Sequence, residues 1–553
     1  MKRPTPFIER IRRQASPLEN HLIDGYLDGR VSRRAFMRHG SLLGLSLGTL
    51  GRIAGGALGA LPLATAARAE AGATIRVAQV VPAGAVDPVT VSSAGGLLLL
   101  MQTGEFLCVT GPDLVLQPRL ATSWTPNADG TVWTFELREG VTFHDGSPFN
   151  ADAVVATFDR LSDPANSSNA LSAFAGFLSP GGARKAGEHT VEFHLEAANG
   201  SFPYLVSSDN YNAILLPAGY AGDFEATFVG TGPFRLERYT TNVGASFVRN
   251  DDYWGEKALP DRTEFSFYPD IQPMILALRA GQVDVIYQVP VLAGVSLFSD
   301  PTINVISLNS SAHQQIHMRT DTPPFQDKRV RRALALTLDR PLLVDGLMKG
   351  RAVAGNDSPL SPIYPTTDTS VPQREKNVAE AKALLEAAGA ADGFQVTLTA
   401  QRFQEIPEYA QLVQAAALEI GVQLDLNILD QAAYYGDAVF GKSNWLDSTM
   451  GITDYGHRGV PNVYLSAPLR SDGSWNAARF NDPDYDRLVA AYIATADLEA
   501  QREQAGQIQR LLLDETPVIF GYFYDYLTAT APGVEGVQPT AISQLFLERA
   551  TKA

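Results

Sequence analysis

Residues 127–161 constrain the fold more than any other part of this 553-residue sequence. The Asn-Ala-Asp-Gly sequence at 127–130 is typical of a turn, and residues 132–138 then alternate between apolar and polar side chains, which predicts a strand. A second short strand is predicted at 141–144, before another turn. Asn150 is predicted to cap a helix whose apolar residues recur at helical spacing through 161. Strand and helix signals this close together predict a mixed α/β fold.

The same mixture continues along the rest of the chain. Residues 74–80 alternate as a strand does, and residues 271–281 have the apolar spacing of a helix that ends at a glycine. Asp327 and Asn377 are predicted to cap two further helices. Internal repeats, heptads and low-complexity tracts are not found. The fold class predicted is therefore α/β, or mixed α+β, in several lobes.

The first 69 residues differ in character from the rest and are predicted to be a leader with an N-terminal extension. Residues 32–38, Ser-Arg-Arg-Ala-Phe-Met-Arg, resemble the bacterial twin-arginine export motif. A weakly apolar run at 40–51 follows, too short to span a bilayer as a helix. Ala67-Arg68-Ala69 is the predicted cleavage site, with residues 64–66 as the alternative.

The charge of the chain is divided between this leader and an acidic body. The whole sequence has 44 Lys and Arg against 60 Asp and Glu; residues 1–69 hold 11 basic and 4 acidic residues, which leaves 33 and 56, or about −23, for the body. Such a body repels phosphate backbones, so no nucleic-acid partner is expected. The single cysteine, Cys108, excludes an intrachain disulfide and a cysteine-based metal centre.

A resemblance to a known family rests on several short sequences in a fixed order. The segment at 141–155, VTFHDGSPFNADAVV, resembles the hallmark of the bacterial extracellular solute-binding proteins for peptides and nickel, family 5. The other sequences that carry the resemblance are LATSW at 120–124, GTGPF at 230–234, RNDDYW at 249–254, GQVDV at 281–285, PFQDKRVR at 324–331 and DPDYD at 482–486. The resemblance covers the chain from residue 73 onward.

The resemblance implies a two-lobe, three-domain architecture that closes about a hinge, like other periplasmic binding proteins. Domain I would combine residues 73–105, 225–300 and 518–553, with domain II at 106–224 and domain III at 305–517. It also implies a monomer that captures a small peptide or peptide-like solute in the periplasm and delivers it to the permease of an ABC importer. The leader implies contact with the twin-arginine export machinery, and the sequence leaves uptake and sensing both open.

The candidate ligand site follows from the same resemblance. The family places an acidic residue for the ligand's amine in a segment like residues 451–455, and Asp454 takes that position. Arg458 lies in a stretch, 456–462, that departs from the family pattern. A guanidinium there would suit a ligand carboxylate or phosphate, or would pair internally with Asp454. The remaining candidates are Tyr455, His457, Trp445, Tyr434, Trp475 and Arg402, with Tyr435, Asn476 and Arg319 as further possibilities. The aromatic candidates suit a core position at least as well.

Two other functions remain open from the sequence. A carrier of a nickel chelate or an opine-like anionic conjugate would use the same fold, and His313 and His317 could ligate a metal only if their segment were helical. A twin-arginine exported enzyme would need a catalytic motif, and neither G-x-S-x-G nor H-E-x-x-H nor a phosphate-binding glycine loop is present. No catalytic residue, metal or cofactor is therefore expected.

Overall fold

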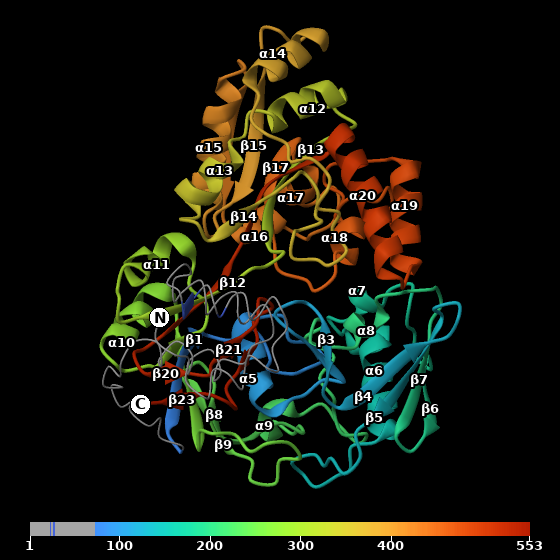
Figure 1. Cartoon of the computed structure of the whole chain (residues 1–553), viewed down its shortest axis with the longest axis vertical. Helices are drawn as coiled ribbons and strands as arrows, with labels where there is room; N and C mark the ends of the chain where they lie inside the picture. Colours follow the sequence, from blue (N-terminus) through green and yellow to red (C-terminus); the bar gives the residue numbers. More distant parts are fainter. Residues whose placement is uncertain (1–22, 24–25, 28–71) are drawn as a thin grey trace. The chain divides into compact units, whose positions relative to one another are not determined.

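The computed structural model of the chain describes residues 23, 26, 27 and 72–553 (Figure 1). Residues 70–552 form one compact unit, and every element discussed below belongs to it. The predicted leader, with its arginine pair and cleavage site, lies outside the described residues. Within the described part of the chain, no helix has both the length and the apolar character needed to cross a membrane.

A seven-stranded sheet joins the beginning of this unit to its end. Its strands, in spatial order, are β12 (Asn304–Leu308), β19 (Tyr526–Thr530), β11 (Val285–Ile286), β1 (Thr74–Val80), β10 (Arg262–Tyr268), β9 (Gly244–Arg249) and β8 (Phe234–Thr240). The predicted strand at 74–80 is β1, which runs parallel to both of its neighbours. Asp284, from the GQVDV sequence, accepts a hydrogen bond from the Arg76 backbone N–H (2.9 Å) and forms an ion pair with Lys552 (2.7 Å). This family sequence therefore ties β1 to the C-terminus.

A four-stranded antiparallel sheet forms around the turn-rich region. Its strands are β4 (Ala121–Pro126), β5 (Val132–Leu137), β7 (Thr190–His194) and β6 (Ala183–Gly187). The predicted cap is confirmed, because the Asn150 side chain accepts from two backbone N–H groups at the start of α6 (Ala151–Ser162). The predicted strand at 141–144 is wrong. The Phe143 N–H closes a turn by donating to Ser147 O, and the His144 N–H donates to the distant Gly230 O, both at 2.8 Å; among the described residues, only one isolated bridge, between Thr142 and Pro148, forms here.

A six-stranded sheet carries the candidate site. Its strands are β14 (Ala352–Ala354), β18 (Val518–Tyr524), β13 (His313–Met318), β17 (Met450–Tyr455), β15 (Gln395–Gln401) and β16 (Gln423–Leu429). The larger helices of this region are α12 (Lys328–Ala335), α14 (Val378–Ala387), α15 (Ile406–Leu418), α19 (Pro483–Ala494) and α20 (Leu498–Glu515), and α19 and α20 lie side by side (Figure 1). The predicted caps Asp327 and Asn377 are confirmed at α12 and α14.

The remaining elements are short helices and paired strands that connect these sheets. They are α5 (Ala94–Thr103), β2 (Cys108–Thr110), β3 (Leu116–Pro118), α7 (Leu171–Phe174), α8 (Phe202–Leu205), α9 (Phe224–Thr227), α10 (Ile271–Arg279), α11 (Val291–Phe298), α13 (Arg340–Leu342), α16 (Gln431–Tyr435), α17 (Asn444–Asp447), α18 (Asn462–Ser466), β20 (Val534–Glu535), β21 (Gln538–Pro539), β22 (Leu545–Phe546) and β23 (Thr551–Lys552). The predicted helix at 271–281 is α10, and Gly281 follows it at a φ of 66°, a conformation that favours glycine. Strand β18 is anchored by Asp357, which is fully buried, pairs with Arg340 and Arg374 (2.6 Å each) and accepts from Phe520 N (3.0 Å).

Candidate functional site

Asp454 lies near the C-terminal end of β17, where its carboxylate meets side chains from two other strands. Tyr524 of β18 donates a hydrogen bond of 2.9 Å to Asp454 Oδ1. Gln314 lies directly opposite Asp454 on β13 and accepts a hydrogen bond of 2.5 Å from the hydroxyl of Tyr522. Strands adjacent in space but far apart in sequence therefore hold the carboxylate in place.

The Asp454 carboxylate has no cationic partner among the described residues. Burial raises its pKa to about 7, and the hydrogen bond from Tyr524 partly opposes that shift, while the negative charge of Glu405 adds to it. None of the ion pairs of the described chain includes Asp454. A half-buried carboxylate in this state would be stabilised by a cation brought from outside, since an opposite charge favours the ionised form.

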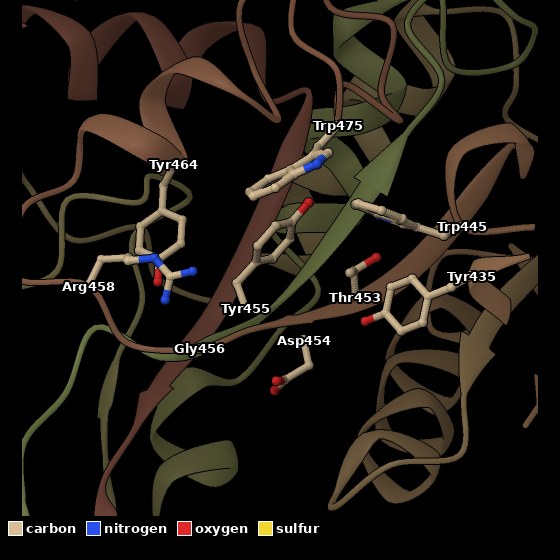
Figure 2. A pocket seen from close by; sticks show the side chains of 9 residues that line it. All are labelled: Tyr435, Trp445, Thr453, Asp454, Tyr455, Gly456, Arg458, Tyr464 and Trp475. Atoms are coloured by element: carbon tan, nitrogen blue, oxygen red, sulfur yellow. The ribbon is translucent and has the colours of Figure 1, made fainter. Parts of the chain in front are cut away.

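A pocket of about 200 Å³ surrounds this end of β17 (Figure 2). Its lining residues are Tyr435, Trp445, Thr453, Asp454, Tyr455, Gly456, Arg458, Tyr464 and Trp475. Thr453 and Tyr455 project from the opposite side of the strand to Asp454, as the alternation of a strand requires (Figure 2). The Tyr455 hydroxyl and the Trp445 indole N–H are buried and have no hydrogen-bond partner in good geometry among the described residues. The aromatic side therefore offers polar atoms to a ligand as well as ring faces.

Arg458 lines the same pocket on its other side, beside Tyr464 (Figure 2). Its backbone is fixed, because Arg458 N–H donates to Ser311 Oγ (3.0 Å) and Tyr364 Oη donates to Arg458 O (2.8 Å). Of its guanidinium, one nitrogen donates to His457 O at 2.9 Å. No ion pair between Arg458 and Asp454 is found in the described chain, so the structure gives no support to the internal pairing that the sequence left open.

Three of the eight predicted site residues do not line this pocket. His457 is buried and accepts a hydrogen bond from Ser311 N (2.9 Å); burial, with the charge of Arg458, lowers its pKa to about 3, so it is neutral at pH 7. Tyr434 is fully buried and donates to Ile452 O (2.9 Å). Arg402 is exposed. Asp454, Arg458, Tyr455, Trp445 and Trp475 are the predicted residues that the pocket brings together.

Several contributors were missed by the sequence analysis. Tyr464 and Thr453 line the pocket, and Tyr524 bonds to Asp454 from a strand 70 residues away in sequence. Strand β18 is buried along its whole length, so its sequence, VIFGYFY, indicates only a core strand. The position of Tyr524 depends on strand order, which local sequence patterns do not encode.

His313 and His317, which could ligate a metal together only if their segment were helical, lie on strand β13. His313 packs against the Tyr455 ring with 5.4 Å between ring centroids. The Nε2 atom of His317 forms a hydrogen bond of 3.1 Å with Ser448 O. Burial lowers the pKa of each to about 4. Among the described residues, no group of three or more His, Cys, Asp or Glu side chains is arranged to hold a metal ion.

Comparison with known proteins places this site in a family. The sequence model described as "Bacterial extracellular solute-binding proteins, family 5 Middle" matches residues 115–474, which include β17 and every residue lining its pocket except Trp475. The chain belongs to this family. Its members bind solutes outside the cytoplasm, and the fold is that of the periplasmic binding proteins.

Two relatives and one solved structure illustrate the relationship. Heme-binding protein A of Haemophilus influenzae is 27% identical over 433 residues, covering 73% of this chain and 78% of the relative. Di/tripeptide-binding protein 1 of Pseudomonas aeruginosa is 28% identical over 431 residues, covering 72% and 79%. The periplasmic binding protein DppA from Helicobacter pylori, solved in complex with the peptide STSA, has a TM-score of 0.70 at 20% identity, covering 87% of this chain and 98% of that one.

Proposed function

We propose that this solute-binding protein captures a small peptide or peptide-like solute with a free amine and delivers it to the permease of an ABC importer. The ligand's ammonium group would pair with Asp454, and a carboxylate of the ligand would pair with Arg458. The protein would act by holding its ligand without transforming it.

The carboxylate of Asp454 carries this proposal. It is half-buried, its pKa is raised to about 7, and a hydroxyl rather than a cation contacts it. A ligand ammonium would supply the missing charge in a low-dielectric site, where such pairs are strong. The Di/tripeptide-binding protein of P. aeruginosa and the peptide complex of H. pylori DppA support a peptide as the ligand class.

The export route and the domain division belong to the same proposal. The twin-arginine motif at 32–38 would send the folded chain to the periplasm, with cleavage after Ala69. Residues 73–105, 225–300 and 518–553 would form domain I, 106–224 domain II and 305–517 domain III. The protein would work as a monomer whose lobes close over the ligand, a motion that the ligand favours by its contacts with both lobes.

A binding experiment with matched peptides tests the proposal. The purified protein is titrated calorimetrically with Ala-Ala-Ala and with N-acetyl-Ala-Ala-Ala, which lacks the ammonium charge, while chromatography follows peptide integrity. We expect the free-amine peptide to bind at least about tenfold tighter and to be recovered intact, because acetylation leaves Asp454 without a cation. Equal affinity for both peptides would refute the amine site, and peptide cleavage would refute a carrier role.

A further inference from the structure

A second, larger cavity lies beside the pocket at β17. Its volume is about 700 Å³, within the range of about 300–1,000 Å³ that is usual for small-molecule sites. One wall comes from residues 169–212 and the other from residues 458–494. Arg458 and Trp475 line both this cavity and the 200 Å³ pocket, so a ligand held at β17 can extend past these two side chains. We call this larger cavity the side compartment.

The two walls of the side compartment touch each other directly. Gly200 N–H of the first wall donates a hydrogen bond of 2.9 Å to Ile493 O of the second. Gly459 packs so closely on the Asp209 side chain that a Cβ atom at Gly459 would lie 1.5 Å from Asp209 Oδ2. A group inside the compartment is therefore held between two walls that are already in contact.

The charged side chains described in these walls leave no cation for a second acidic group. Asp209, Arg458 and Arg470 are the charged residues among those lining the compartment. Arg470 lies 3.3 Å from the carboxylate of Asp472, and the proposed function assigns Arg458 to the ligand's own terminal carboxylate. A further acidic group would lie near Asp209 without a free cation among the described lining residues and would lose its hydration. The compartment therefore disfavours an acidic group.

The remaining wall surface suits a bulky apolar group with a ring. Seven alanines line the compartment, and their small side chains leave its volume open. Phe177, Tyr211 and Trp475 present aromatic side chains at its edge. Aromatic pairs add attraction beyond the area they bury when the rings are offset or edge-to-face.

The distance from Asp454 to this compartment sets the length of the ligand. Arg458 lies four positions after Asp454 in the sequence, so their Cα atoms are at most about 14 Å apart. An extended peptide advances about 3.3–3.6 Å per residue, and a ligand whose amine meets Asp454 therefore reaches Arg458 within about four residues.

We propose that the side compartment binds an uncharged, bulky apolar group on the third or fourth unit of the solute. The protein would thus select amine-bearing solutes longer than a dipeptide and with a large apolar end. The proposal rests on the proposed function for the position of the amine, whereas its selectivity depends only on the walls of the compartment.

Calorimetric titration of the full-length purified protein with Ala-Ala-Trp and Ala-Ala-Ala tests the compartment. We expect Ala-Ala-Trp to bind about tenfold tighter or more, because the compartment buries the indole. Ala-Ala-Glu should show no such gain, because Arg458 would hold its terminal carboxylate and the described walls offer no further free cation for its side chain. The proposal is overturned if Ala-Ala-Trp binds no tighter than Ala-Ala-Ala, or if Ala-Ala-Glu gains as much.

Filling variants from both walls identify the cavity responsible. Ala173→Phe narrows it from the first wall and Ala467→Phe from the second, while Ala383→Phe on the exposed face of α14 is the matched control. Each filling variant should reduce the affinity for Ala-Ala-Trp to that for Ala-Ala-Ala, and leave the latter within about twofold. A retained preference for Ala-Ala-Trp in both variants, or an equal loss for both peptides in both, would overturn the proposal.

An acetylated probe separates this proposal from the proposed function. If N-acetyl-Ala-Ala-Trp binds as tightly as Ala-Ala-Trp and the filling variants still reduce its affinity, the side compartment is supported and the amine site at Asp454 is refuted. If acetylation abolishes binding but Ala-Ala-Trp binds no tighter than Ala-Ala-Ala, the amine site at Asp454 is supported and the proposal for the side compartment is refuted.

Discussion

Tyr524 of β18 reaches across the intervening strand β13 and donates a hydrogen bond of 2.9 Å to Asp454 Oδ1 on β17. The donor stabilises the charged carboxylate, whereas burial stabilises the protonated form. The balance leaves the pKa of Asp454 near 7, so small changes in its surroundings alter its charge at neutral pH. The pH dependence of binding and the effect of Tyr524→Phe both follow from this balance.

Asp454→Ala should weaken the binding of a free-amine peptide such as Ala-Ala-Ala by about 2–5 kcal/mol, the usual cost of removing one partner from a buried charged pair. Isothermal titration calorimetry at pH 7.5 measures the loss. Asp392→Ala, on an exposed turn away from the pocket, is the control and should bind like the unmodified chain. An unchanged dissociation constant for the Asp454 variant would reject this residue as the amine partner.

The affinity for the same peptide should rise with pH through about 7. Below that value Asp454 is protonated and must release a proton before it can pair with an ammonium group; above about 8 the ligand's α-amine itself loses its charge. The affinity is therefore expected to be greatest between these two values. Titrations from pH 5 to 9 in buffers of different ionisation enthalpy would also detect proton release below pH 7. A flat profile over this range would contradict the prediction.

Tyr524→Phe should move the rising limb of that pH profile to higher pH. The variant removes the hydroxyl that favours the ionised carboxylate, and a hydrogen bond to a charged group contributes about 1.5–3 kcal/mol, or roughly one to two pH units. The loss of affinity caused by Tyr524→Phe should therefore be smaller at pH 9 than at pH 7. Tyr526→Phe serves as the control, because its buried hydroxyl has no hydrogen-bond partner of good geometry among the described residues. Parallel profiles for the variant and the unmodified chain would count against the pKa mechanism.

Arg458→Gln should distinguish peptides by their carboxyl end. The loss of affinity is expected to be about tenfold or more for Ala-Ala-Ala and much smaller for its C-terminal amide, because glutamine cannot form a charged pair with a carboxylate. The guanidinium has one hydrogen bond to its own neighbour's carbonyl and no described ion pair, so its removal leaves few internal groups unsatisfied. Equal losses for the acid and the amide would show that Arg458 does not bind the ligand's carboxylate.

Gly459→Ala should displace the Asp209 side chain. The added Cβ would lie 1.5 Å from Asp209 Oδ2, which forces that side chain to move and costs roughly 1–3 kcal/mol. The melting temperature should therefore fall. Gly219→Ala is the control, since no atom lies within 4 Å of the Cβ added there. Identical melting temperatures for both variants would contradict the contact between Gly459 and Asp209.

Local sequence patterns predicted individual elements well. The alternation at 74–80 became β1 with the same bounds, and Asn150, Asp327 and Asn377 cap helices as expected. The strand and the three caps depend on residues close to one another in the sequence. The predicted strand at 141–144 failed because its donors bond within a turn and to Gly230, a residue far along the chain.

The candidate site was only partly accessible from sequence. The family resemblance at 451–455 was enough to propose Asp454, and the departure from the family pattern at 456–462 drew attention to Arg458. Tyr524 and Asp209 come from distant segments, and no spacing in the sequence relates them to β17. The strand order of the six-stranded sheet brings Tyr524 to Asp454, and contact between two separate walls brings Asp209 to Gly459. Both relationships are properties of tertiary structure.

Strands β18 and β19 follow each other with only Asp525 between them, yet each is an interior strand of a different sheet. Both sheets therefore stay incomplete until nearly the entire polypeptide has been synthesised. A ribosome that stops before residue 518 releases a chain with two unfilled gaps, each bordered by unpaired backbone groups open to aggregation. Exposed sheet edges therefore distinguish such a truncated product from a chain that contains residues 518–530.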